Sequence, residues 1–126
     1  MLVIRKKAIN DLITKHGESN MLGAFAEARD FTIIDRQTIL MINDNKMISI
    51  TISKLYNEVK KVEVFNRRDI KYIKISKSIM STKLAIETDT FKGTFLIKNK
   101  ISTLGEMQKE FLHKLDLFAD MFNEGQ

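Results

Sequence analysis

Residues 103–122, TLGEMQKEFLHKLDLFADMF, carry the most regular pattern in the chain. Their apolar residues recur at steps of 3, 4, 4, 3 and 4, the spacing of one face of an α-helix. These residues are Leu104, Met107, Phe111, Leu115, Phe118 and Phe122. The polar residues assigned to the opposite face are Gln108, Lys109, His113, Asp116 and Asp120. Thr103 and Glu106 have the spacing of a capping box, with Ser102 as the alternative cap. We therefore expect a C-terminal helix that covers the open side of a core.

Before this helix, between residues 18 and 100, apolar and polar residues alternate with the period of a β-strand. Short β-branched runs between turn-forming residues predict strands at 31–35, 38–42, 46–53, 70–76, 84–88 and 94–98. Turns are predicted at 35–37, 43–45, 66–69 and 89–93. Residues 22–28 alternate as a strand does, although their alanines also suit a helix. Residues 54–64 fit either structure, and we favour a turn near Asn57 followed by a strand.

The N-terminal segment returns to helical spacing, because apolar residues recur between 2 and 16 and Gly17 follows as a helix stop. We divide the chain into an N-terminal helix at 1–17 and a domain at 18–126. The predicted fold class is α+β. It comprises the N-terminal helix, about seven antiparallel strands in a barrel or half-barrel, and the capping helix at 103–122.

Composition narrows the function further. A chain of 126 residues is long enough for one domain. Because the sequence contains no cysteine, disulfides, thiolate metal sites and cysteine nucleophiles are excluded. Its formal net charge of +5 mildly favours anionic partners. The N-terminus lacks the charge order of a secretory signal, and no apolar run approaches the roughly 18–20 residues of a membrane span. We therefore expect a cytoplasmic protein.

Two stretches carry a resemblance. Residues 31–42 (FTIIDRQTILMI) place a polar turn between two apolar strands, and residues 66–97 (NRRDIKYIKISKSIMSTKLAIETDTFKGTFLI) place a polar bend before three strands. With the terminal helix they resemble the bacterial pleckstrin-homology-like domain family. Two features depart from it: the segment 43–59 is long, and the turn at 77–80 reads Lys-Ser-Ile-Met where such domains often have glycine. The resemblance implies a non-enzymatic binding or scaffolding module. Lipid binding is not carried over, because the turn at 35–37 holds a single cation.

The sequence shows none of the common catalytic motifs, so we expect no enzyme, cofactor, metal or small-molecule substrate. The candidates for acid–base chemistry are His113 and the alternating pair Glu87 and Asp89. An ordinary solvated surface explains the histidine and the carboxylate pair better. A basic cluster with interleaved outward aromatics, Phe65 and Tyr72, is more suggestive. It contains Lys60, Lys61, Arg67, Arg68, Lys71, Lys74, Lys77 and Lys83. Lysines on strands also protect sheet edges, which is the simpler interpretation of the cluster.

Two surfaces follow from these patterns. The first is a protein-binding or self-association surface, made by the apolar face of the N-terminal helix and by apolar residues on the outward faces of two strands. Its candidate residues are Ile4, Ile9, Leu12, Ile39, Met41 and Met47. The second, from a different functional class, is a patch for nucleic acid or an anionic membrane surface. Its candidate residues are Lys61, Arg67, Arg68, Lys71 and Lys74.

Overall fold

The computed structural model describes residues 4–29, 36–53 and 58–124. Within them seven strands form one antiparallel sheet, in the order β4-β3-β2-β1-β7-β6-β5. The strands are β1 (Leu22–Arg29), β2 (Arg36–Ile42), β3 (Lys46–Ile52), β4 (Val59–Asn66), β5 (Tyr72–Lys77), β6 (Ser81–Glu87) and β7 (Lys92–Lys98). The helices are α1 (Lys6–His16) and α2 (Met107–Glu124), with short 3-10 turns η1 (Arg67–Asp69) and η2 (Ser102–Leu104). The predicted fold class is confirmed.

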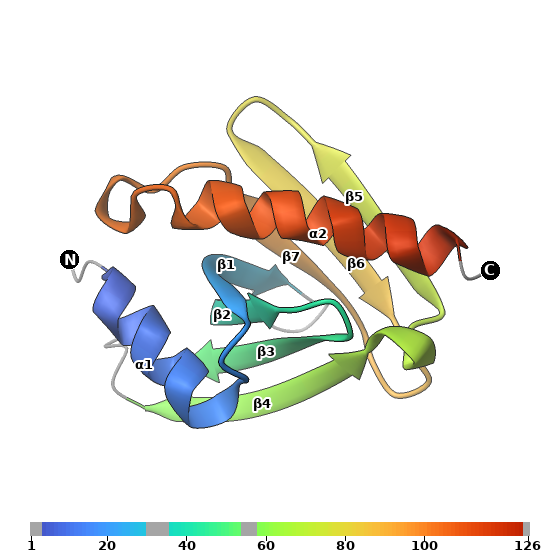
Figure 1. Cartoon of the computed structure of the whole chain (residues 1–126), viewed down its shortest axis with the longest axis horizontal. Coiled ribbons are helices and arrows are strands. Elements are labelled where there is room, and N and C mark those ends of the chain that lie inside the picture. Colours follow the sequence, from blue (N-terminus) through green and yellow to red (C-terminus); the bar gives the residue numbers. More distant parts are fainter. Residues whose placement is uncertain (1–3, 30–35, 54–57, 125–126) are drawn as a thin grey trace.

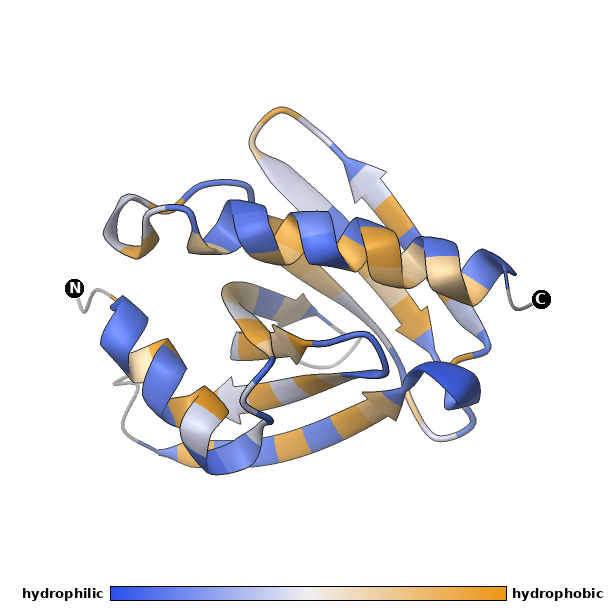
Figure 2. Cartoon of the chain, in the orientation of Figure 1, coloured by the Kyte–Doolittle hydropathy of each residue, from blue (hydrophilic) through white to orange (hydrophobic). Residues whose placement is uncertain are grey.

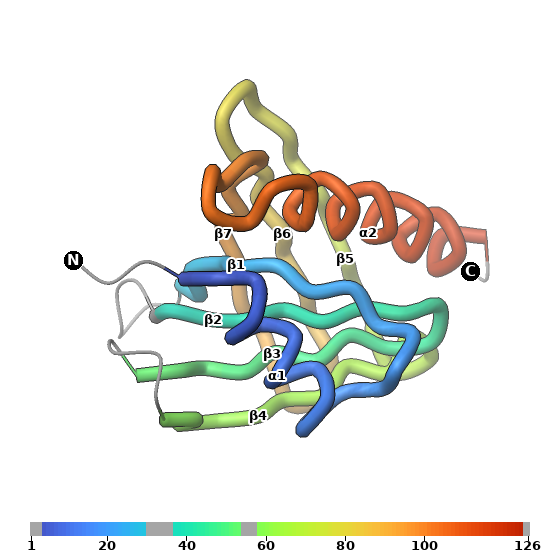
Figure 3. The backbone as a smooth tube through the Cα atoms, turned by 60° about the vertical axis from the view of Figure 1, so that its left-hand side comes forward, coloured from blue at the N-terminus to red at the C-terminus, as the bar shows by residue number. Residues whose placement is uncertain are grey.

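The sheet bends into a half-barrel that α2 covers (Figure 1). In Figure 3 the strands β1–β4 run across the direction of β5–β7, so the two halves face each other. The inner core lies between these halves and α2. It takes Phe111, Leu115, Phe118 and Phe122 from the helix and aromatic residues such as Phe65 and Phe95 from the strands. The stripe along 103–122 is therefore the lid of the core, and Figure 2 shows it as bands of apolar colour along α2.

A second, outer core lies on the other face of β1–β4, beneath α1. Ile9 and Ile13 of α1 pack there on Ile39, Met41 and Ile50, all of them buried. Both faces of β2 and β3 are covered as a result, which explains why most residues of these two strands are buried. The helix belongs to the same packed body as the sheet.

The N-terminus of α2 differs from the expectation. Because α2 begins at Met107, Thr103 is not its N-cap, and its hydroxyl instead donates a hydrogen bond of 2.8 Å to the carbonyl of Ile4. Gly105, with φ of 57°, turns the chain between η2 and α2, and a side chain there would be strained. Gln108 is also not on a polar face but fully buried.

The predicted strand at 31–35 and Asn57, with the rest of 54–57, lie outside the described residues. Arg36 and Gln37 belong to β2, so the turn predicted at 35–37 is wrong for these two residues. The strand expected after residue 57 is confirmed as β4, and residues 22–28 form a strand, not a helix. Figure 2 shows the alternation along β4 that supported this prediction.

Candidate functional site

The five cations of the predicted basic patch do not meet in one place. Lys61 lies on β4 and Lys74 on β5, which are the two opposite ends of the strand order. Arg67 and Arg68 occupy η1, the corner between those strands, and Lys71 follows it. Lys61 alternates in phase with buried Phe65 on the inner face of β4, whereas Lys74 alternates in phase with exposed Tyr72 on the outer face of β5. The expectation of a single patch is wrong.

Two of these cations are already engaged by neighbouring carboxylates. The Lys61 ammonium lies 3.3 Å from Glu63, and the Lys71 ammonium lies 2.5 Å from Asp89. The hydrogen bond to Asp89, followed by its charge, raises the pKa of Lys71 above its ordinary value. Asp89 is thereby held by a lysine. Arg68 and Lys74 have no ion-pair partner among the described residues.

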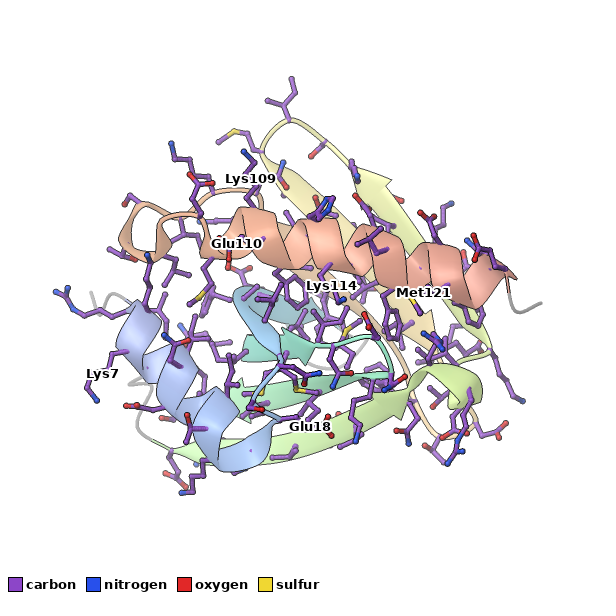
Figure 4. The ribbon with its side chains drawn as sticks, viewed as in Figure 1. Lys7, Glu18, Lys109, Glu110, Lys114 and Met121 are labelled. Atoms are coloured by element: carbon purple, nitrogen blue, oxygen red, sulfur yellow. The ribbon has the colours of Figure 1, made fainter. Side chains whose placement is uncertain are left out.

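At the corner itself, Arg67 donates to the backbone carbonyl of Asp44 at 2.5 Å, and its guanidinium lies 3.5 Å from the sulfur of Met121. The ammonium of Lys114 pairs with the Asp44 carboxylate, and this hydrogen bond and charge hold the pKa of Asp44 below its ordinary value. Figure 4 shows Lys114 and Met121 along the lower side of α2. These contacts fasten α2 to the turn between β2 and β3. A hollow of about 550 Å³ remains beside them, lined in part by Arg68 and Asn66.

Basic and aromatic side chains do gather on the outer face of β5–β7. A hollow of about 540 Å³ has Ala85 and Thr94 in its floor. Its rim includes Tyr72, Lys83 and Lys92, together with Arg29 and Glu87. Lys74 stands opposite Ala85 on the same face. We call the surface formed by Tyr72, Lys74, Lys83 and Lys92 the outer basic face. Lys92 was missed in the sequence because only strand pairing places it beside the others.

The predicted protein-binding surface is not a surface. Ile4, Ile9, Ile39 and Met41 are buried in the outer core, Met47 is buried in the inner core, and Leu12 is half-buried. The helix α1 folds back on β1–β3 and covers the outer row that contains Ile39 and Met41, while Met47 points to the opposite face and into the inner core. Phe65, expected to point outward, is likewise buried in the inner core.

An apolar pair does remain uncovered on β4. Val62 and Val64 lie on the outer face of this strand, with 43% and 52% of their surface exposed. They stand opposite Ile50 and Ile48 of β3, which are buried. Beyond β4 no further strand of the described sheet follows, so its second edge is unpaired. The alternation along 59–66 predicted two faces for this strand, but not its place at the edge.

Comparison with known proteins supports the fold. No family model matches the chain, and no curated protein does. Among solved structures, the hSac2 domain of the human phosphoinositide phosphatase Sac2 aligns over 98% of this chain and 85% of its own, with 10% identity and a TM-score of 0.53. A PH domain, that of USP37, aligns over 86% and 100% with 14% identity and a TM-score of 0.45. A C-terminal domain of an unknown Leishmania infantum protein aligns over 90% and 94% with 14% identity and a TM-score of 0.46.

The chain therefore shares its fold with the hSac2 domain. At these identities the likeness concerns the fold alone, so any function must be argued from this chain's own residues. Among those described, no group of three or more histidine, aspartate or glutamate side chains could hold a metal ion. None of the described helices combines the length and hydrophobicity that crossing a bilayer requires.

Proposed function

We propose that this chain is a non-catalytic, protein-binding module related to the bacterial PH-like domains, and that it binds a second copy of itself along the edge of β4. The observation that carries the proposal is the exposure of Val62 and Val64 on an end strand that has one unpaired edge and whose neighbours Ile48 and Ile50 on β3 are buried. A strand added to this edge satisfies free backbone groups and extends the apolar rows. The cytoplasmic location stays a prediction.

The sequence of β4 is self-complementary in the way that a twofold dimer requires. In an antiparallel pair of β4 strands with Val62 on the axis, Lys61 of each copy faces Glu63 of the other. Both side chains lie on the inner face, since they alternate with Val62. In the register centred on Glu63, by contrast, two glutamates oppose each other. Opposite charges therefore favour one register and reject its neighbour.

Reversing one charge tests this pairing. Glu63→Lys places two lysines opposite each other at two symmetric positions, and at about 0.2–1 kcal/mol per cross-strand pair it should weaken the dimer about 2- to 30-fold. The double variant Lys61→Glu with Glu63→Lys restores opposite charges and should recover most of the affinity. Sedimentation equilibrium of the wild type and both variants measures the dissociation constants.

A matched control is Glu87→Lys, which makes the same charge change on β6, a strand that is paired on both sides. It should leave the dissociation constant unchanged. A wild type that stays monomeric at the highest soluble concentration, or a double variant no better than Glu63→Lys, would rule out this interface.

A second candidate function rests on the outer basic face. An exposed tyrosine beside three lysines can stack on a base and neutralise phosphates of single-stranded nucleic acid. If so, binding of a fluorescent oligonucleotide weakens steeply with salt, and Tyr72→Ala weakens it roughly tenfold, since base stacking contributes about 1–3 kcal/mol. Tyr72→Phe keeps the ring and should bind as the wild type does. Equal binding by Tyr72→Ala would discard this candidate.

A further inference from the structure

The hairpin between β5 and β6 presents two large apolar side chains to solvent. Ile79 is 97% exposed and Met80 79% exposed, the highest values among the exposed large hydrophobic residues of the described chain. They sit in the sequence Ser-Ile-Met-Ser at 78–81, which we call the hairpin tip. Figures 1 and 3 show this hairpin standing out beyond α2, away from both cores. Packing within the chain therefore does not explain these two residues.

The backbone of the hairpin tip has its carbonyl groups satisfied from within the protein. The side-chain amide of Asn99 donates to the carbonyls of Ser78 and Ile79, at 3.0 and 3.1 Å. The backbone amide of Asn99 donates to the carbonyl of Met80 at 3.0 Å. The backbone amide of Ser78 donates to the carbonyl of Ser81 at 2.9 Å. Four consecutive carbonyls thus need no water.

This arrangement lowers the cost of removing the hairpin tip from water. An unpaired carbonyl resists transfer into an apolar medium, whereas a hydrogen-bonded one does not lose a partner there. Asn99 is itself held, because its carbonyl oxygen accepts a hydrogen bond of 2.7 Å from the hydroxyl of Thr82. The tip is thus a preformed apolar projection with fixed hydrogen bonds.

Lysines surround the base of this projection. Lys83 lies two residues into β6, Lys98 faces Ser81 across the β6–β7 pairing, and Lys100 lies two residues beyond the end of β7. All three are exposed, and none has an ion-pair partner among the described residues. Lys77 pairs with Asp116 at 2.6 Å, which neutralises the nearby carboxylate of α2. The net field at the base of the hairpin tip is therefore positive.

We propose that the hairpin tip docks on an anionic lipid bilayer. Ile79 and Met80 enter the boundary between headgroups and acyl chains, while Lys83, Lys98 and Lys100 stay at the level of the headgroups. A bilayer fits these features because the surface is convex, apolar only at its apex and positive around it. This site is separate from the edge of β4 and does not depend on the dimer.

Vesicle co-sedimentation tests the proposal, with phosphatidylcholine vesicles that contain or lack phosphatidylserine. The wild type should bind the anionic vesicles and bind neutral ones far more weakly. The double variant Ile79→Ser with Met80→Ser should lose at least tenfold in affinity, since it removes nearly all the inserted apolar surface. Lys98→Gln with Lys100→Gln should lose roughly 5-fold or more for each lysine and reduce the dependence on salt.

Leu117→Ser is the matched control, because Leu117 is also an exposed apolar residue but lies on α2. It should bind as the wild type does, and thermal melts should show that every variant is folded. Soluble glycerophosphoserine should not compete, which separates a bilayer from a free headgroup. The proposal is wrong if the wild type does not bind anionic vesicles, or if the Ile79 and Met80 variant binds them as tightly as the wild type does. It is also wrong if the protein binds an oligonucleotide and does not bind lipid.

Discussion

Phe111→Ala is expected to lower the free energy of unfolding by about 3–5 kcal/mol. Phe111 is fully buried in the inner core, where α2 closes the half-barrel. Truncation removes the transfer free energy of the ring and leaves a cavity between α2 and the sheet, which neither side can fill without moving the helix. A loss of this size is a large part of the stability of a domain of 126 residues.

Urea denaturation followed by circular dichroism measures this loss. Leu117→Ala is the control, since it shortens an apolar side chain on the same helix that is 45% exposed, and should cost no more than about 1 kcal/mol. Leu115→Ala, also in the inner core, should cost about 2–5 kcal/mol. A loss below about 1 kcal/mol for Phe111→Ala would mean that α2 is not docked on the sheet as described.

The docking of α2 was predictable because helical periodicity depends only on residues close in the chain. Phe111, Leu115 and Phe118 had to share a face, and a face of that size had to be buried. The starting point of the helix was less predictable, since Thr103 and Glu106 have capping-box spacing whether or not a helix begins there. Tertiary structure decided otherwise: Thr103 donates to Ile4, at the other end of the chain.

Which element covers the apolar residues of β2 and β3 could not be predicted from the sequence in the same way. Alternation assigns Ile39 and Met41 to one face of a strand, but it does not say what covers that face. The structure places α1 there, so a set of residues expected to contact a partner became core. Residues left over for contact are instead those just beyond the reach of α1, Val62 and Val64.

The candidate sites could not be predicted from the sequence for a related reason: which residues lie side by side depends on the order of the strands in the sheet. Lys61 and Lys74 are close in sequence but lie on opposite end strands, whereas Lys92 joins Tyr72 through two strand pairings. Ile79 and Met80 could be recognised as an unusual turn sequence. Only the hydrogen bonds from Asn99, about twenty residues later, show that this turn is a fixed projection.

Gln108 gives the second large expected effect: Gln108→Met should lower the free energy of unfolding by about 2–5 kcal/mol. The Gln108 amide accepts from the backbone N–H of Phe25 at 2.8 Å and donates to the carbonyls of Phe25 and Lys98 at 3.0 and 2.8 Å. Phe25 lies two residues before β1 begins to pair with β7, so Gln108 takes the place of a strand partner. Methionine has a similar volume but leaves all three backbone groups without this partner.

Because methionine fills the same space, a loss of stability in this variant comes from unpaired polar groups and not from a cavity. Amide hydrogen exchange separates the two directly: the amide of Phe25 should exchange slowly in the wild type and much faster in Gln108→Met. Lys109→Met changes the next residue, which is exposed, and should alter neither stability nor exchange. Were Gln108→Met as stable as the wild type, with Phe25 still protected, the buried amide would not be what joins α2 to the gap between β1 and β7.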